Sequence, residues 1–123
     1  MSLHFMSAKN QRAFEKGHHD NKCVELPEKI QNYLDAHKSY FSNGITILLP
    51  ANNYCDALLY DYKIKQLLQV CAEIQRSTDD YSIYDKCKPF GIKKEELQTF
   101  SNELLELLQS ALDSGSLVFS VGD

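Results

Sequence analysis

The sequence has no long apolar run, and this absence argues against a membrane protein. No apolar stretch reaches the roughly 18 to 20 residues that span a bilayer, and the first twenty residues lack the apolar centre of a secretory signal. We therefore expect a cytoplasmic protein that makes no membrane contact.

Motifs for catalysis and nucleotide binding are also absent. The chain contains no G-x-S-x-G, no P-loop and no G-x-G-x-x-G, and its five glycines stand where turns or helix ends are expected. The imidazoles are few: His4, His18 and His19 lie near the N-terminus, and His37 falls on the apolar face of a predicted helix. The sequence therefore predicts no enzymatic activity, no catalytic residue and no cofactor.

Cysteine is too sparse for a disulfide-stapled mini-domain, because Cys23, Cys55, Cys71 and Cys87 contain no C-x-x-C pair. Free thiols are the simplest interpretation, with a disulfide as the alternative. Cys71 is expected on the side of a helix that faces the protein core. The nearest approach to a metal cluster is His18, His19, Asp20 and Cys23. Gly17 and Asn21 favour a turn there and no fourth ligand lies nearby, so we expect no metal site.

Positive charge is in the minority. Thirteen Lys and Arg against 17 Asp and Glu give a net charge of −4, which argues against binding to nucleic acid. A chain of 123 residues has the usual size of one domain. We expect residues 1–25 to form a loosely ordered N-terminal segment, in which Leu3, Phe5, Ala13 and Phe14 can dock, and residues 26–123 to form a single α+β domain.

Apolar residues recur at helical spacing in three stretches. They predict helices over residues 27–41, over a stretch capped by Asn52 or Asn53 that ends near Ser77, and over residues 93–114. The stripe of the second helix comprises Tyr60, Ile64, Leu67, Cys71 and Ile74, and that of the third comprises Leu97, Phe100, Leu104, Leu107 and Ala111.

Two β-branched or apolar runs, residues 45–49 and 117–121, are typical of strands, and residues 77–91 are rich in turn formers and predict a loop. Two isolated strands are marginal in water, so we expect them to pair with each other, with residues 2–6 or with another chain. The predicted fold is therefore α+β and helix-dominated, with three main helices packed on a small sheet of two or three short strands.

Tyrosine and aspartate are interleaved in the middle of the chain, where five of the seven tyrosines lie between residues 54 and 84. Residues 79–113 hold four basic and eight acidic side chains, whereas residues 1–78 hold nine basic and eight acidic ones. Tyrosine offers rigid contact area with a polar tip, and carboxylates steer a basic partner. We predict a partner-binding surface made of Asp79, Asp80, Tyr81, Tyr84, Asp85, Glu95 and Glu96.

The alternative interpretation is that Tyr60 and Ile83 pack inward and that the acidic residues form an ordinary solvated loop and helix face. In that case the tyrosine and aspartate pattern supports solubility and binds nothing.

The core of residues 77–91, Asp80-Tyr81-Ser82-Ile83-Tyr84-Asp85, resembles the acidic, tyrosine-bearing segment of the small immunity proteins of nuclease bacteriocins. The resemblance is one of surface chemistry and covers about a tenth of the chain, and the predicted strands depart from the all-helical form of those proteins. It implies an inhibitor that covers the basic active site of a nuclease.

The predicted function is therefore binding of another protein, expected to be basic, most concretely as an immunity or antitoxin-like inhibitor. Two alternatives remain open. The spacing of the two long helices and the strand edges also suits a self-associating structural module, such as a homodimer. A small secretion chaperone or adaptor for another protein would have the same size, charge and fold class.

Overall fold

The computed structural model describes residues 2–18, 22–50 and 57–122 of the chain. Within them the strands are β1 (Leu3–Ala8), β2 (Cys23–Leu26), β3 (Ala57–Leu59) and β4 (Leu117–Gly122). The α-helices are α1 (Gln11–Glu15), α2 (Glu28–Ala36), α3 (Asp61–Ser77), α4 (Ile83–Cys87) and α5 (Lys94–Ser114). Short 3-10 helices are η1 (Lys38–Tyr40), η2 (Asn43–Leu48) and η4 (Lys88–Phe90). The helix-dominated α+β fold that the sequence predicts is confirmed.

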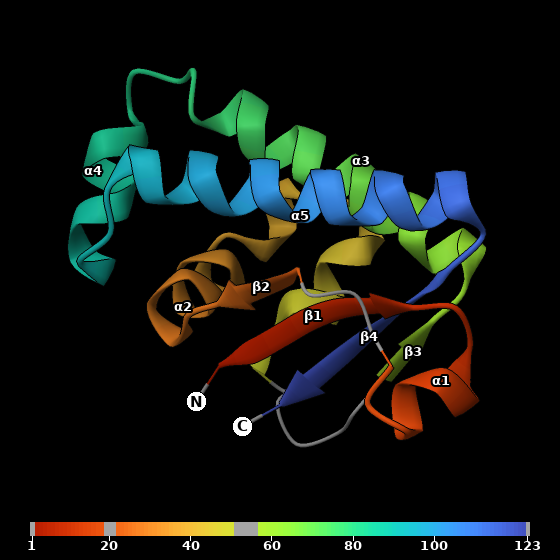
Figure 1. Cartoon of the computed structure of the whole chain (residues 1–123). Coiled ribbons are helices and arrows are strands. Elements are labelled where there is room, and N and C mark those ends of the chain that lie inside the picture. The colour runs from red at the N-terminus through yellow and green to blue at the C-terminus, as the bar shows by residue number, and fades with distance from the viewer. Residues whose placement is uncertain (1, 19–21, 51–56, 123) are drawn as a thin grey trace.

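The four strands form one antiparallel sheet in the order β2-β1-β4-β3. The first and last strands lie side by side in its centre, and Leu3 pairs with Gly122. The two described ends of the chain therefore meet at one end of the sheet (Figure 1). Of the three pairing partners that the sequence left open for residues 117–121, the structure shows the N-terminal residues.

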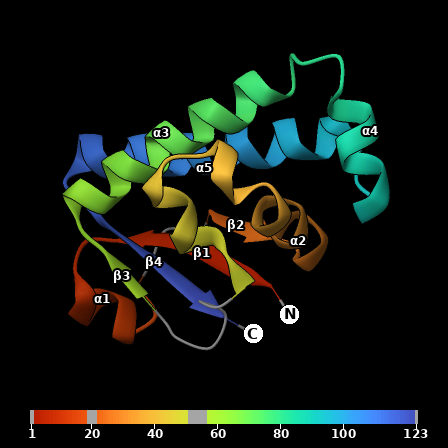
Figure 2. The ribbon, with the colours of Figure 1, turned by 180° about the vertical axis from the view of Figure 1, so that it is seen from behind.

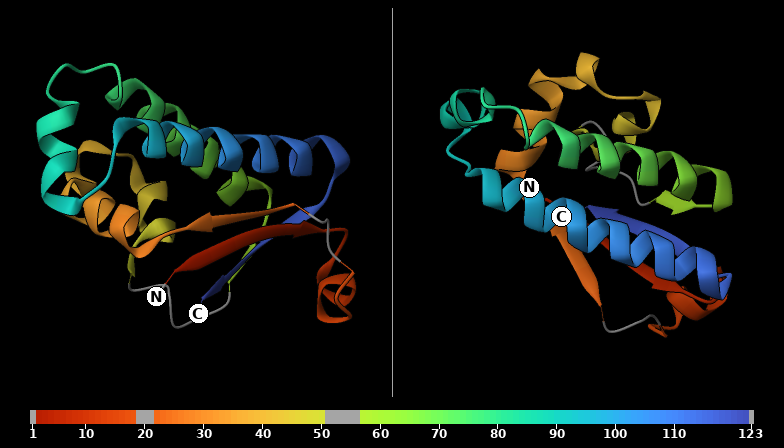
Figure 3. Two further views of the ribbon diagram at one scale, coloured as in Figure 1. Left: turned by 60° about the vertical axis from the view of Figure 1, so that its left-hand side comes forward. Right: turned by 90° about the horizontal axis from the view of Figure 1, so that it is seen from above.

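Helices cover the two faces of the sheet unequally. Seen from the front and from behind, α3 and α5 lie side by side over one face (Figures 1 and 2), and the two helices pack along their lengths. The short helix α1 covers part of the opposite face, where Phe14 stacks on Phe119 with ring centroids 3.9 Å apart. Helices α4 and α1 lie at opposite ends of the molecule (Figure 3).

The core lies between the sheet and the α3–α5 layer. Alternate strand residues such as Leu3, Phe5 and Val118 are fully buried there, as expected for a strand with one covered face. The helices contribute the apolar stripes that the sequence predicts, from Ile64 to Ile74 in α3 and from Leu97 to Ala111 in α5. Cys71 is among the buried residues of α3, as predicted.

The third predicted helix is confirmed almost to the residue. It ends at Gly115, which adopts a left-handed conformation with φ 70°. The N–H of Ser116 donates to the carbonyl of Ala111 at 2.8 Å, a closure typical of helix C-termini.

The second predicted helix begins later than its spacing suggested. Helix α3 starts at Asp61, and Ala57–Leu59 instead forms the edge strand β3. Tyr60 is consequently the N-cap residue of α3 and is 53% exposed, so it does not belong to the buried stripe. The proposed caps Asn52 and Asn53 lie outside the described residues.

The N-terminal segment differs from the expectation of loose order. Residues 3–8 form a central strand, residues 23–26 pair with them, and Leu3 and Phe5 are fully buried. The first predicted helix is shorter than residues 27–41, because α2 ends at Ala36 and η1 follows. Strands of six and four residues contain few alternations of apolar and polar side chains, so their period is difficult to recognise in the sequence.

The strand predicted at residues 45–49 is wrong, because residues 45–48 belong to the 3-10 helix η2 and Leu49 is its C-cap residue. Tertiary contacts override its β-branched composition. Before η2, the carboxylate of Glu73 accepts hydrogen bonds from both the backbone N–H and the hydroxyl of Ser42. At its end, buried Gln31 donates to the carbonyl of Leu48 at 3.1 Å. Residues three apart share a side of a 3-10 helix, so Ile45 and Leu48 both reach the core.

Replacing Gly44 tests how tightly η2 packs on α3. A Cβ at this position would lie 2.9 Å from the carbonyl oxygen of Gln66, closer than two such atoms approach. We expect Gly44→Ala to lower the free energy of unfolding by about 1 to 3 kcal/mol through overpacking, measured by urea denaturation. The neighbouring exposed Asn43→Ala is the control and should change it by about 0.5 kcal/mol or less. Equal effects of the two variants would contradict the close packing.

Candidate functional site

The predicted loop at residues 77–91 contains regular structure. After α3 ends at Ser77, a turn leads into the one-turn helix α4, then η4, and then Gly91 with φ 67°. Ile83 and Cys87, four residues apart, lie on one side of α4 and are buried in the core. The turn formers marked the ends of this segment, and the apolar pair between them was the signal for a helix.

An aromatic cluster supports α4 and η4 from the side of α2. The ring of Phe90 lies edge-on to the ring of Tyr33, with the ring centroids 5.8 Å apart, and its centroid lies 6.0 Å from that of the His37 ring. Burial raises the pKa of Tyr33 to about 12, with smaller contributions from Cys87 and Asp80. His37, the C-cap residue of α2, donates from Nδ1 to the carbonyl of Tyr33 at 2.9 Å, so it lies just after the helix on whose apolar face it was predicted.

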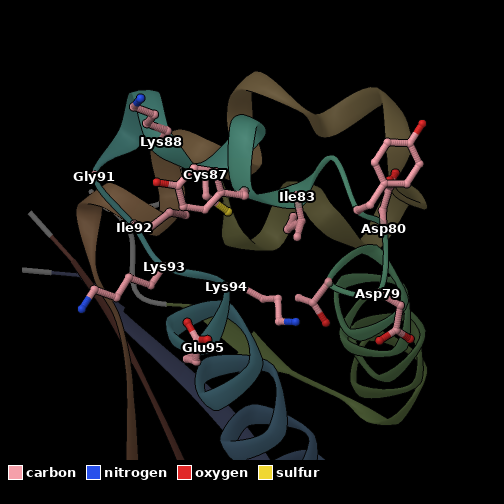
Figure 4. Close-up of a pocket in the computed structure, with 13 residues that line it drawn as sticks. Asp79, Asp80, Ile83, Cys87, Lys88, Gly91, Ile92, Lys93, Lys94 and Glu95 are labelled. Carbon is pink, nitrogen blue, oxygen red and sulfur yellow. The ribbon is translucent and has the colours of Figure 1, made fainter.

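The end of α3, helix α4 and the start of α5 enclose a pocket of about 810 Å³, which we call the α4 pocket (Figure 4). Its floor includes Ile83, Cys87 and Ile92, all 5% exposed or less. The volume lies within the range of about 300 to 1,000 Å³ that binding pockets occupy. The α4 pocket is therefore an apolar depression with a polar rim.

The structure brings most of the predicted partner-binding residues to this rim. Asp79, Asp80, Tyr81, Tyr84 and Glu95 all line the α4 pocket. The two tyrosines are strongly exposed, Tyr81 at 98% and Tyr84 at 71%. Two large aromatic side chains thus stand in solvent beside a depression with an apolar floor.

Asp80 is fixed by local contacts. Its carboxylate accepts the backbone N–H of Ser82 at 2.9 Å and lies 3.6 Å from the ammonium of Lys86. Hydrogen bonds from Ser82, together with Lys86, hold the pKa of Asp80 below its ordinary value. Lys86 also lies 5.3 Å from the centroid of the Tyr40 ring. This carboxylate is therefore ionised and oriented at neutral pH.

Asp85 and Glu96, the other two predicted site residues, do not line the α4 pocket. Asp85 is exposed on α4. Glu96 forms an ion pair with Lys29 at 2.6 Å and accepts the backbone N–H of Lys93, the N-cap of α5. The hydrogen bond from Lys29 is the main cause of the lowered pKa of Glu96. Glu96 thus joins α2 to α5 and has a structural role.

Sequence reasoning missed three lysines at the same rim. Lys88, Lys93 and Lys94 line the α4 pocket together with the predicted acidic residues. Their signal was visible in the sequence as basic residues on both sides of Pro89-Phe90-Gly91. They belong to the charge balance of residues 79–113, but the excess of acidic residues there concealed that the rim of the pocket carries both positive and negative charges.

A second, shallower groove of about 320 Å³ adjoins the first through Glu95. It runs between the start of α2 and α5, over the apolar side chains of Pro27, Ile30 and Phe100. Its acidic residues are Glu25, Glu95, Glu96 and Glu103. Much of the negative charge of the chain therefore lies beside the α4 pocket.

The cysteines and the predicted histidine cluster provide no further site in the described part of the chain. Cys23, Cys71 and Cys87 are free thiols, and burial raises the pKa of Cys71 to about 12. Residues 2–18, 22–50 and 57–122 contain no group of three His, Cys, Asp or Glu side chains arranged to hold a metal. His19, Asp20 and Cys55 lie outside the described residues.

No helix in the described ranges has both the length and the apolarity to cross a membrane. Comparison of the chain with protein families, with curated proteins and with solved structures finds no match. The geometry and chemistry of the site are therefore the basis for any functional conclusion.

Removing Lys29 tests the role of Glu96. The folded-state pKa of Glu96 is lowered, so its ion pair stabilises the fold above the ordinary carboxyl pKa and is lost as the pH falls through the lowered value. We expect Lys29→Gln to reduce stability at neutral pH by about 0.2 to 1 kcal/mol, the range of a solvent-exposed ion pair. Between about pH 6 and about pH 3, the thermal midpoint of the variant should also fall less than that of the unaltered protein.

The control is Lys63→Gln, which removes the same charge from a lysine that has no ion-pair partner among the described residues. Its thermal midpoint should follow that of the unaltered protein over the pH range. Parallel curves for Lys29→Gln and Lys63→Gln would contradict a structural ion pair at Glu96.

Proposed function

We propose that the protein is a non-enzymatic binding domain and that the rim of the α4 pocket contacts another protein. The observation that carries this proposal is the pair Tyr81 and Tyr84, exposed at 98% and 71% beside a pocket with an apolar floor. Such aromatic side chains are the residues that most often dominate binding energy in protein interfaces. The solvated-loop alternative leaves their exposure without a function.

The rings of these two tyrosines have no aromatic or cationic partner among the described residues. Burying a tyrosine removes about 150 Å² or more of surface from water, and neither ring forms a ring stack or cation contact among the described residues. A partner that covers both rings also excludes water from the carboxylates of Asp79 and Asp80 at the same rim. Exclusion of water strengthens a charged hydrogen bond to them.

The most concrete form of this function is an inhibitor of the immunity or antitoxin type, directed at a basic partner. Two features support it: the net charge of −4, and the glutamate-lined groove that continues the α4 pocket through Glu95. A negative field raises the association rate with a positively charged protein. A chaperone or adaptor function would use the same surface for a different client.

Self-association is the second candidate, because the face of the sheet opposite α3 and α5 is incompletely covered. Met6, Leu58 and Val121 retain intermediate exposure there. Partly exposed apolar side chains on one face are a feature of surfaces that bind other proteins. A mass measurement in solution separates the two candidates, since the binding proposal requires a different protein and self-association requires a second copy.

The double variant Tyr81→Ala/Tyr84→Ala tests the binding proposal. We expect it to weaken a partner complex by several kcal/mol, because each aromatic hot spot contributes about 2 kcal/mol or more, while the thermal midpoint stays nearly unchanged because both rings are exposed. The measurement is capture of proteins from a lysate of the source organism on immobilised protein, followed by titration calorimetry with the protein that is retained.

The matched control is Tyr60→Ala/Tyr62→Ala. These two tyrosines are also more than half exposed, but they belong to the start of α3, away from the α4 pocket. The control should retain the same protein as the unaltered chain. Equal retention by both double variants would sink the assignment to Tyr81 and Tyr84, and recovery of a discrete oligomer of the bait alone would favour self-association.

A further inference from the structure

The rim of the α4 pocket has an acidic end and a basic end. Asp79 and Asp80 follow directly after α3, whereas Lys88 belongs to η4 and Lys93 precedes α5. Figure 4 shows the two aspartates on one side of the pocket and these two lysines on the other, with Lys94 between them in this view. Glu95 lies on the side of the lysines in this view. One side of the pocket therefore carries two carboxylates, and the other carries the lysines with one carboxylate and is net positive.

Most of these charges are unused within the molecule. Asp79, Glu95, Lys88 and Lys94 form no ion pair with any residue that the structure describes. Lys93 forms no direct ion pair there either, although its charge contributes to the lowered pKa of Glu96. Elsewhere in the molecule many lysines do have partners, as Lys29 and Lys22 have on α5. The unpaired rim charges remain available to a partner molecule.

The floor between the two ends is apolar. Ile83 and Ile92 are 4% and 5% exposed, and the Cys87 thiol between them in sequence is 1% exposed. Burial raises the pKa of this thiol, so it stays neutral and behaves as a small apolar group. A side chain that enters the pocket meets no charge at its floor.

This arrangement discriminates between possible occupants. A uniformly basic segment would find Asp79 and Asp80 at one end but would meet three lysines, Lys88, Lys93 and Lys94, against the single carboxylate of Glu95 over the rest of the rim. A uniformly acidic segment would find the lysines at one end but would be repelled by Asp79 and Asp80 at the other. Like charges brought together in an interface weaken binding, so the pocket selects against both kinds of segment.

We propose that the segment of the partner that enters the α4 pocket carries an apolar side chain flanked by a basic residue on one side and an acidic residue on the other. This inference rests on the proposed function, since it presupposes that the pocket binds a protein. The basic residue contacts Asp79 and Asp80, the apolar side chain lies over Ile83 and Ile92, and the acidic residue contacts Lys88 and Lys93.

A mixed segment is compatible with a partner that is basic overall. Steering depends on the net charges of the two whole molecules, whereas docking depends on the groups that finally touch. The glutamates of the adjoining groove, Glu25 and Glu103 among them, lie outside the α4 pocket and face the rest of the partner. Net attraction and local charge matching thus involve different residues.

The test uses synthetic peptides as probes, with acetylated and amidated ends that carry no charge. One peptide has the order Arg-Ala-Phe-Ala-Glu, and the comparison peptides are Arg-Ala-Phe-Ala-Arg, Glu-Ala-Phe-Ala-Glu and Arg-Ala-Ala-Ala-Glu. A set with one to three alanines on each side of the central residue covers different spans of the pocket. Binding to the full chain is followed by amide chemical shifts in nuclear magnetic resonance titrations.

We expect the mixed peptide with phenylalanine to bind about tenfold or more tightly than each of the three comparison peptides, and we expect the shifts at residues 79–95. That ratio corresponds to one lost charge contact or one lost apolar contact of about 1.4 kcal/mol. In the variant Lys88→Glu/Lys93→Glu the preference should change to the peptide with two arginines. Both lysines are exposed, so this variant is expected to fold.

The control variant is Lys9→Glu/Lys16→Glu, which changes the net charge by the same amount at exposed lysines beside α1, far from α4. It should keep the preference for the mixed peptide. Tighter binding of the two-arginine peptide to the unaltered chain would overturn the inference, and so would binding of none of the peptides. Either result leaves the proposed function standing if Tyr81→Ala/Tyr84→Ala still abolishes capture of a partner, so the two can fail separately.

Discussion

The antiparallel pairing of β1 with β4 joins the two ends of the described chain, and the rest of the fold depends on it. This pairing extends from Leu3 opposite Gly122 to Ala8 opposite Leu117. Among the described residues, β2 pairs only with β1 and β3 only with β4, so losing the β1–β4 pairing would divide the sheet into two separate pairs of strands. Only two residues separate the end of α5 from the start of β4, so the same pairing also sets where α5 lies over the sheet.

The α4 pocket is a consequence of that placement. Helix α3 packs along α5, and the chain between them must connect the end of one to the start of the other. Ile83, Cys87 and Ile92 bury this connection against the core, and Phe90 ties it to Tyr33 and His37. The site therefore rests on a scaffold of long-range contacts, although its residues are close together in sequence.

Periodicity in the sequence predicts the long elements well and the short ones poorly. Helix α5 carries a sustained apolar stripe and ends at a glycine, so both its ends are predictable. Strands of three and four residues, such as β3 and β2, show too few alternations to be distinguished from other structure. The β-branched run that begins at residue 45 was wrongly predicted as a strand, because two contacts from outside the segment hold it as a 3-10 helix. These are the hydrogen bond to the Glu73 carboxylate and the close approach of Gly44 to α3.

The same limit applies to the site. Composition alone locates the segment, and five of the seven predicted residues line one pocket. Composition cannot distinguish residues that share a helix turn, so it could not separate Tyr84 from its neighbour Asp85, nor Glu95 from Glu96, which contacts Lys29. It also sums charges over a segment, and the separation of Asp79 and Asp80 from Lys88 and Lys93 appears only in three dimensions.

The two exposed tyrosines of the proposed interface differ in how much order they already have. Tyr84 belongs to α4, which Ile83 and Cys87 anchor in the core, so its backbone is fixed before any partner arrives. Tyr81 lies in the turn before α4 and is 98% exposed. Ordering such a side chain on binding costs about 0.5 to 1.5 kcal/mol. In the proposed interface, Tyr84 would therefore contribute more net affinity than Tyr81 for equal buried area. Tyr81 would act chiefly by shielding the carboxylates of Asp79 and Asp80 from water.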